Sequence, residues 1–175
     1  MSRYSFLTAV IVFTAVLAAE GCSSPPKVAV RPNEHMEIGW TPRAIFQSPS
    51  YAVWFDSGYQ HYIPSEEIIH ALRTMQDSVG IVVVYGTWCS DSRRELPHLL
   101  KVLDASAFPA ERLTLIAVDR TMQIPAGIKE RYAITNVPTI MIVYRGVEVS
   151  RIVESPATTL EGDMRDALGP IFGGK

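Results

Sequence analysis

Residues 81–89 read Ile-Val-Val-Val-Tyr-Gly-Thr-Trp-Cys, and residues 90–92 continue with Ser-Asp-Ser. The run from Ile81 to Tyr85 is continuously β-branched or aromatic, which is typical of a strand buried on both faces of a sheet. The pattern after Cys89 predicts a helix from Ser90 to about Ala105, with a kink at Pro97. We therefore expect Cys89 at a junction between a buried strand and a helix.

Strand and helix patterns alternate on both sides of this junction. Ser65, followed by two glutamates, predicts a helix start, and apolar residues recur at helical spacing as far as Met75. The further predicted elements are a strand at 113–118, a helix at 124–132, strands at 139–144 and 148–153 joined by Arg145-Gly146, and a helix at 158–168. This order predicts an α/β fold: a central mixed sheet with a parallel core and an antiparallel edge hairpin, flanked by helices.

The position of Cys89 favours nucleophilic chemistry. The first turn of a helix has free N–H groups and a partial positive charge, and both favour a thiolate. A thiolate is the nucleophile in disulfide exchange. Ser90 and Ser92 are candidate donors to the sulfur, and Arg93 and Arg94 add positive charge nearby. Cys89 is thus a candidate catalytic residue.

A second candidate element is Asn136-Val137-Pro138-Thr139. A proline just before a predicted buried strand is a good candidate for a cis peptide bond. Such a loop exposes the backbone of Val137, which can pair with an extended peptide by strand addition. We therefore expect Val137 and Pro138 to bind substrate.

Taken together, residues from about 81 to 168 resemble the thioredoxin superfamily. The resemblance rests on the stretch that ends at Cys89, on Pro97 eight residues later, and on residues 117–119 and 132–139, which read Ala-Val-Asp and Tyr-Ala-Ile-Thr-Asn-Val-Pro-Thr. Trp-Cys-x-Asp-Ser also resembles a bacterial branch of the family whose commoner members carry Trp-Cys-x-Asp-Cys. The resemblance implies a thioredoxin-like fold in which Cys89 attacks, Trp88 shields it and Pro138 is the cis-proline opposite it.

Two positions depart from the family pattern. Ser92 stands where the family has its resolving cysteine, and Val83 stands where thioredoxins keep a buried acid that assists proton transfer. Both losses affect the release of a mixed disulfide by a second thiol, so we do not expect the thioredoxin reductase cycle.

Two functions remain open. The first is monothiol chemistry on protein or low-molecular-weight thiol and disulfide substrates: isomerase-like, deglutathionylating or mixed-disulfide-forming. Its expected catalytic residues are Cys89 and Ser92. Its expected substrate-binding residues are Trp88, Val137 and Pro138. The alternative is a non-catalytic thioredoxin-fold module that binds an envelope partner in the groove beside Trp88 and Pro138.

Composition argues against several other classes. The formal charge is −2 and no basic run is present, which argues against nucleic-acid binding. Two cysteines are too few for a disulfide framework or a four-thiolate zinc site, and the four histidines show no ligand spacing, so we expect no metal and no other cofactor. A peroxiredoxin-type peroxidase fits less well, because those enzymes need a threonine three residues before the cysteine and Thr87 lies two before it.

Residues 1–21 read as an export signal. Arg3 precedes an almost unbroken apolar run from 6 to 19. This run is shorter than the roughly 20 residues of a typical spanning helix, and an uncleaved anchor is the other interpretation.

Ala19-Glu20-Gly21-Cys22 resembles a bacterial lipobox, in which the cysteine is lipidated, although Ala19 and Glu20 depart from the usual residues. Residues 22–32 then form a tether, and the exported protein is expected in the cell envelope, either lipid-anchored on the membrane or periplasmic. Ordinary cleavage near Ala19 would instead leave Cys22 as a free thiol that can reach Cys89.

The remaining stretch, residues 33–63, is rich in aromatic residues and prolines and shows few regular periods. We interpret it as an N-terminal extension packed on a thioredoxin-like domain at 64–175. A binding surface near the cysteine is the alternative.

Overall fold

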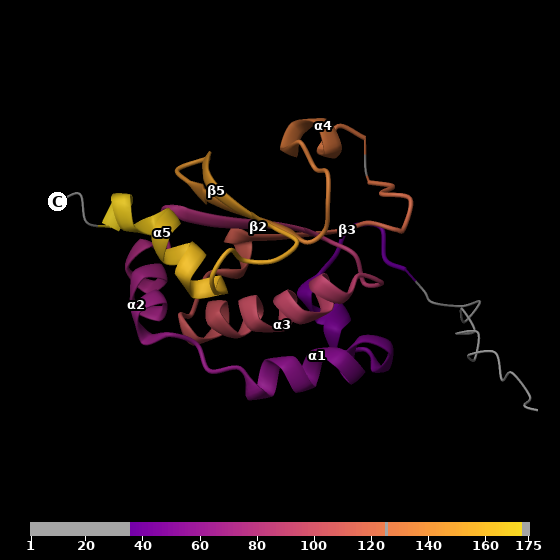
Figure 1. The fold of residues 1–175 in the computed structure, drawn as a ribbon, viewed down its shortest axis with the longest axis horizontal. Coiled ribbons are helices and arrows are strands. Elements are labelled where there is room, and N and C mark those ends of the chain that lie inside the picture. Colours follow the sequence, from indigo (N-terminus) through magenta and orange to yellow (C-terminus); the bar gives the residue numbers. More distant parts are fainter. Residues whose placement is uncertain (1–35, 125, 173–175) are drawn as a thin grey trace, which may run out of the picture. The chain divides into compact units, whose positions relative to one another are not determined.

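The structure is a computed structural model that describes residues 36–124 and 126–172 (Figure 1). The predicted signal peptide, the tether and Cys22 lie outside these residues. The chain divides into units 1–32 and 33–175, and the fold below is that of the second unit. Among the described residues, no helix has the length and apolar character needed to span a membrane.

Five strands form one mixed sheet in the order β1-β3-β2-β4-β5. Their bounds are β1 Gly39–Trp40, β2 Val79–Tyr85, β3 Leu113–Ala117, β4 Thr139–Tyr144 and β5 Val147–Val153. β2 pairs parallel with β3, β2 pairs antiparallel with β4, and β4 and β5 form an antiparallel edge hairpin. The predicted α/β fold, with a parallel core and an antiparallel edge hairpin, is confirmed.

The hairpin turn follows from its two residues. Arg145 and Gly146 adopt φ values of 49° and 84°. Two consecutive positive φ angles are characteristic of the tight turns whose twist matches that of the flanking strands. The structure extends the second strand by one residue, to Val147.

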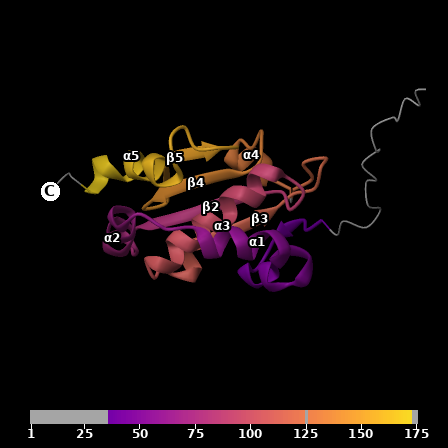
Figure 2. The same ribbon diagram turned by 60° about the horizontal axis from the view of Figure 1, so that its bottom comes forward.

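The helices are distributed unevenly over the two faces of the sheet. Their bounds are α1 Pro49–His61, α2 Glu66–Met75, α3 Ser90–Ala105, α4 Ile128–Tyr132 and α5 Leu160–Phe172, with short 3-10 helices η1 Arg43–Gln47 and η2 Ala110–Arg112. α1, α2, α3 and α5 pack on one another over one face (Figure 1), and Figure 2 shows α1 and α3 in front of the sheet. The five-residue α4 lies on the other face, where Ile128 packs against Val84, Ile116 and Met141.

The stretch 33–63 is more regular than predicted. It forms β1, η1 and α1, and β1 pairs antiparallel with β3 at the edge of the sheet. Phe46, Tyr51 and Phe55 are buried in the larger core cluster. The ring of Phe46 stacks on Phe55 at 4.8 Å and contacts Tyr85 of the central strand at 5.7 Å. These aromatic side chains therefore help to build the core.

Two helices begin later than predicted. α4 starts at Ile128 and not at Ile124, because Gly127 has a φ of 82° and separates it from the preceding turn. α5 starts at Leu160 and not at Thr158, because Thr159 caps it: its hydroxyl accepts a hydrogen bond from the Gly162 N–H at 3.0 Å. α3 has the predicted bounds and continues through Pro97.

Candidate functional site

Cys89 lies at the junction between β2 and α3, as the sequence predicts. It is the N-cap residue of α3, with extended backbone angles (φ −83°, ψ 128°), and its thiol is free and partly exposed. The Cys89 Sγ donates a hydrogen bond to the carbonyl oxygen of Val137 at 3.2 Å. Two residues that are 48 positions apart in the sequence are thus in direct contact.

Val137 belongs to a loop with a cis peptide bond between it and Pro138, as predicted. Both residues are buried. The Thr139 hydroxyl donates to the Asn136 carbonyl at 2.7 Å and closes the loop on itself. The structure therefore brings Cys89, Val137 and Pro138 together.

Trp88 is held firmly beside Cys89. Its indole N–H donates to the Val118 carbonyl at 2.9 Å, and the guanidinium of Arg120 lies 5.2 Å from the centre of its ring. The ring also packs on Gly86, where a Cβ atom would lie only 2.7 Å from the indole. Only glycine at position 86 fits this arrangement, so the conformation of Trp88 is built into the junction.

Ser92 has a different contact from the one expected. It is 1% exposed, and its hydroxyl accepts a hydrogen bond from the Gly86 N–H at 3.2 Å. Within the described part of the chain, neither Ser90 nor Ser92 makes a hydrogen bond to the Cys89 sulfur. Ser92 thus ties the first turn of α3 to the end of β2.

A buried acid is present, but on α3 and not on β2. Val83 is completely buried in the apolar core, whereas Glu95 is 4% exposed and pairs with the Arg94 guanidinium at 2.7 Å. Sequence reasoning missed Glu95. The available signal was its position next to Leu96, on the face of α3 that buries Leu99.

The two arginines of α3 serve different neighbours. The Arg93 side chain donates to the Thr87 carbonyl at 2.6 Å. Arg94 donates to Glu95 and to Asp91. The hydrogen bond to Glu95 has the largest effect on the pKa of Arg94, and the two bonds raise that pKa above its usual value. Arg93 therefore braces the backbone just before Cys89.

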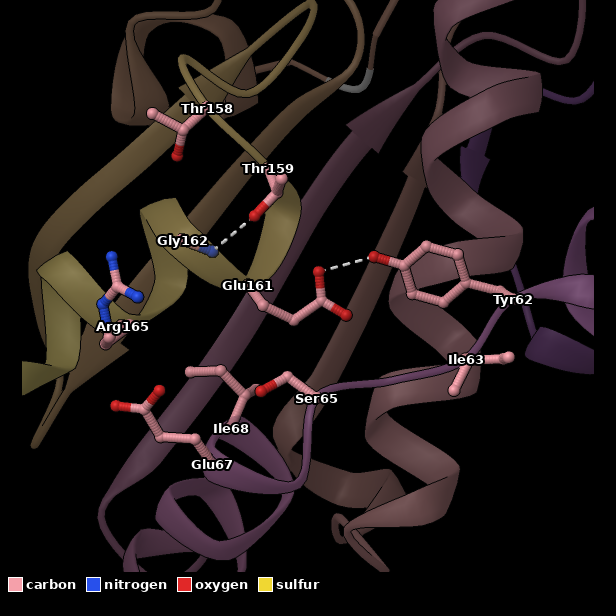
Figure 3. A pocket seen from close by; sticks show the side chains of 10 residues that line it. All are labelled: Tyr62, Ile63, Ser65, Glu67, Ile68, Thr158, Thr159, Glu161, Gly162 and Arg165. Carbon is pink, nitrogen blue, oxygen red and sulfur yellow. Dashed lines mark hydrogen bonds between the residues drawn. The ribbon is translucent and has the colours of Figure 1, made fainter.

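A separate hollow of about 430 Å³ lies between the N-terminal ends of α2 and α5 (Figure 3). Tyr62 extends into it, and its hydroxyl donates to Glu161 at 2.5 Å. Burial, together with this hydrogen bond, raises the pKa of Tyr62, and burial lowers the pKa of His98, whose ring stacks on Tyr62 at 4.0 Å. Neither Cys89 nor the Val137–Pro138 loop lines the hollow, so it is distinct from the cysteine site.

Among residues 36–124 and 126–172, no group of three or more His, Cys, Asp or Glu side chains is placed to hold a metal ion.

Comparisons with known proteins bear on the fold. No family model matches the chain. Mitochondrial thioredoxin-3 of Saccharomyces cerevisiae is 24% identical over 119 residues, which are 67% of this chain and 89% of the yeast protein. This distant similarity agrees with the thioredoxin-like fold described above.

Two solved structures are among the matches to this chain. One is a Pseudomonas aeruginosa protein of unknown function, which is 17% identical with a TM-score of 0.44, over 70% of this chain and 72% of that one. The other is an HIV epitope scaffold, which is 14% identical with a TM-score of 0.43, over 70% and 79% of the two chains.

Proposed function

We propose that this chain carries out thiol-disulfide chemistry with a single thiol, Cys89. The observation that supports this most directly is the contact between the partly exposed Cys89 Sγ and the Val137 carbonyl, at the N-terminus of α3. The thiol lies against the cis-proline loop, and we expect an extended substrate to pair with the backbone of that loop once the thiol releases the Val137 carbonyl. Ser92 lies three residues after Cys89 and contacts Gly86 at the end of β2, and it has a hydroxyl where a second thiol would be needed to release the substrate.

The reaction proceeds in two exchanges. The Cys89 thiolate attacks one sulfur of a substrate disulfide, forms a mixed disulfide with it and releases the other sulfur as a thiolate. A second thiol, from a low-molecular-weight compound or a protein, then attacks the substrate sulfur and releases Cys89. The substrate sulfur ends in a disulfide with the incoming thiol, and Cys89 returns to its starting state. The protein undergoes no net oxidation or reduction, so it needs no cofactor.

The test is adduct formation with a protein disulfide substrate. The wild-type protein is expected to form disulfide-linked adducts that a thiol reductant dissolves, and Cys89→Ala is expected to form none. Ser90→Ala, which changes the adjacent exposed residue and leaves the thiol, serves as the matched control. Equal adduct patterns in wild type and Cys89→Ala would contradict the proposal.

A non-catalytic binding module is the second candidate. It is favoured by the hydroxyl at Ser92 and by the apolar Val83 in the core, since these two positions supply neither a resolving thiol nor a buried acid. A partner that binds wild type and Cys89→Ser with the same affinity, with no adduct in either, would identify this function.

We also propose that the protein is exported and anchored in the cell envelope through a lipid on Cys22. The intact mass of the mature protein from its native membrane, before and after alkylation of free thiols, is expected to show a chain that begins at Cys22 with added acyl groups and one alkylated thiol, Cys89. A mature chain that begins elsewhere, with two alkylated thiols, would contradict the anchor and leave Cys22 available to Cys89.

A further inference from the structure

The loop opposite Cys89 is connected to the helix that begins at Cys89 by a continuous series of hydrogen bonds. The series runs through residues 154 and 155, which follow β5 and belong to neither element. The inference drawn from it rests on the proposed function of Cys89, because it concerns the geometry of the same site.

The first part of the series joins Glu154 to the cis-proline loop. The backbone N–H of Glu154 donates to the Pro138 carbonyl at 2.7 Å. Its carboxylate accepts a hydrogen bond from the Asn136 side-chain amide at 2.9 Å. Glu154 has a φ of 62°, which is uncommon for a residue with a side chain, and this backbone turn directs both groups at the loop.

The second part joins the next residue to α3. The Arg94 guanidinium donates to the Ser155 hydroxyl at 2.8 Å and to Asp91 at 2.8 Å. Its Nε donates to the buried carboxylate of Glu95 at 2.7 Å. Arg94 is therefore held in one orientation by two carboxylates of its own helix, and its third nitrogen donates to the loop after β5.

We propose that Arg94, Ser155 and Glu154 are positioning residues, which hold the Asn136–Pro138 loop at a fixed distance from Cys89 so that a peptide disulfide is aligned for attack. The Cys89–Val137 contact is one hydrogen bond donated by a thiol, and thiols are weak donors. The connection through Arg94, Ser155 and Glu154 supplies a second attachment that remains when the thiol is ionised or has reacted.

These contacts are suited to setting geometry and contribute little to global stability. Ser155, Glu154 and Asn136 are all exposed, and the Arg94 side chain is 47% exposed. Hydrogen bonds and ion pairs at such sites typically add about 1 kcal/mol or less to folding. Loss of these contacts is therefore expected to loosen the loop without unfolding the protein.

The choice of variants follows from the same contacts. Arg94→Ala would also leave Glu95 buried without its partner, and that loss risks unfolding. Ser155→Ala removes only the acceptor for Arg94, and Glu154→Ala removes only the acceptor for Asn136. Glu154→Gln keeps a side-chain oxygen for Asn136 and is the conservative variant. Ser57→Ala, on an exposed part of α1, is the matched control.

Two readouts separate the inference from the proposed function. The first is amide hydrogen exchange at Glu154, which reports on the bond to Pro138 whether or not Cys89 reacts. The second is the rate at which Cys89 reacts with a peptide joined by a disulfide to 2-nitro-5-thiobenzoate, relative to its rate with the small symmetrical disulfide of the same thiol. The small reagent does not need the loop, so the ratio of rates isolates alignment of the peptide.

In Ser155→Ala and Glu154→Ala, we expect the amide hydrogen of residue 154 to exchange about threefold faster. We expect the ratio of the peptide-disulfide rate to the small-disulfide rate to fall about three- to tenfold, the size typical of coupled neighbours. Glu154→Gln and Ser57→Ala are expected to match wild type in both. Unchanged exchange, or a changed exchange with an unchanged rate ratio, overturns the inference. If wild type reacts with neither disulfide, the proposed function of Cys89 fails. Amide exchange that is faster in Ser155→Ala and Glu154→Ala, and wild-type in Glu154→Gln, then still supports the hydrogen-bonded connection between α3 and the cis-proline loop.

Discussion

Replacement of Ser92 by cysteine is expected to shorten the lifetime of a Cys89 mixed disulfide by at least about a hundredfold, because intramolecular attack has a very high effective concentration. Ser92 lies three residues after Cys89, on the same side of the first turn of α3, and it is buried behind the junction. A thiol there can attack Cys89 and release the substrate without an external reductant. The wild-type adduct is expected to persist until a thiol is added.

The measurement is the decay of a purified adduct with the peptide disulfide in the absence of added thiols. Ser90→Cys is the matched control, because it adds a thiol at the exposed adjacent position, whereas Ser92 is buried against Gly86. Its adduct is expected to persist as in wild type. Equal lifetimes for wild type and Ser92→Cys would show that position 92 is not the position of the missing resolving thiol.

Phe46→Ala is expected to destabilise the protein by about 3–5 kcal/mol, the usual cost of removing a large buried aromatic side chain. Phe46 is 2% exposed, stacks on Phe55 and contacts Tyr85, which leads directly into the Cys89 junction. The cost is therefore expected to appear as a lower urea midpoint with an unchanged slope.

The control for this change lies in the same stretch of chain. Val53 on α1 is 83% exposed, and Val53→Ala is expected to change stability by no more than about 0.5 kcal/mol. A loss below about 1 kcal/mol in Phe46→Ala would indicate that η1 and α1 only rest on the domain and do not form part of its core.

The sequence predicted the elements whose patterns are local. The apolar run of β2, the helix after Cys89 and the tight turn at Arg145 each depend on a few adjacent residues, and the structure contains all three. The element α1 was missed for a physical reason. Its core-facing side chains alternate irregularly with other residues, among them the exposed Val53. Gly58 also interrupts the pattern, and it packs so closely on Pro97 that a Cβ there would lie 3.0 Å from the proline side chain.

The site was predicted only in part, again for physical reasons. Cys89, Trp88 and the Val137–Pro138 loop carry recognisable motifs, and the structure places them in contact or side by side. The contacts of Arg94 with Ser155 and of Asn136 with Glu154 join residues 61 and 18 positions apart. Exposed polar side chains of this kind have no periodicity in the sequence, so only the folded arrangement reveals the pairing.

The hydrogen bond from Cys89 to Val137 has a further consequence for the resting protein. Only the protonated thiol can donate it, because a sulfur anion has no proton to give. In the exchange proposed above, the thiolate cannot make this bond, and the Val137 carbonyl is then free to accept a hydrogen bond from an incoming strand. The resting thiol and a docked strand therefore compete for one acceptor.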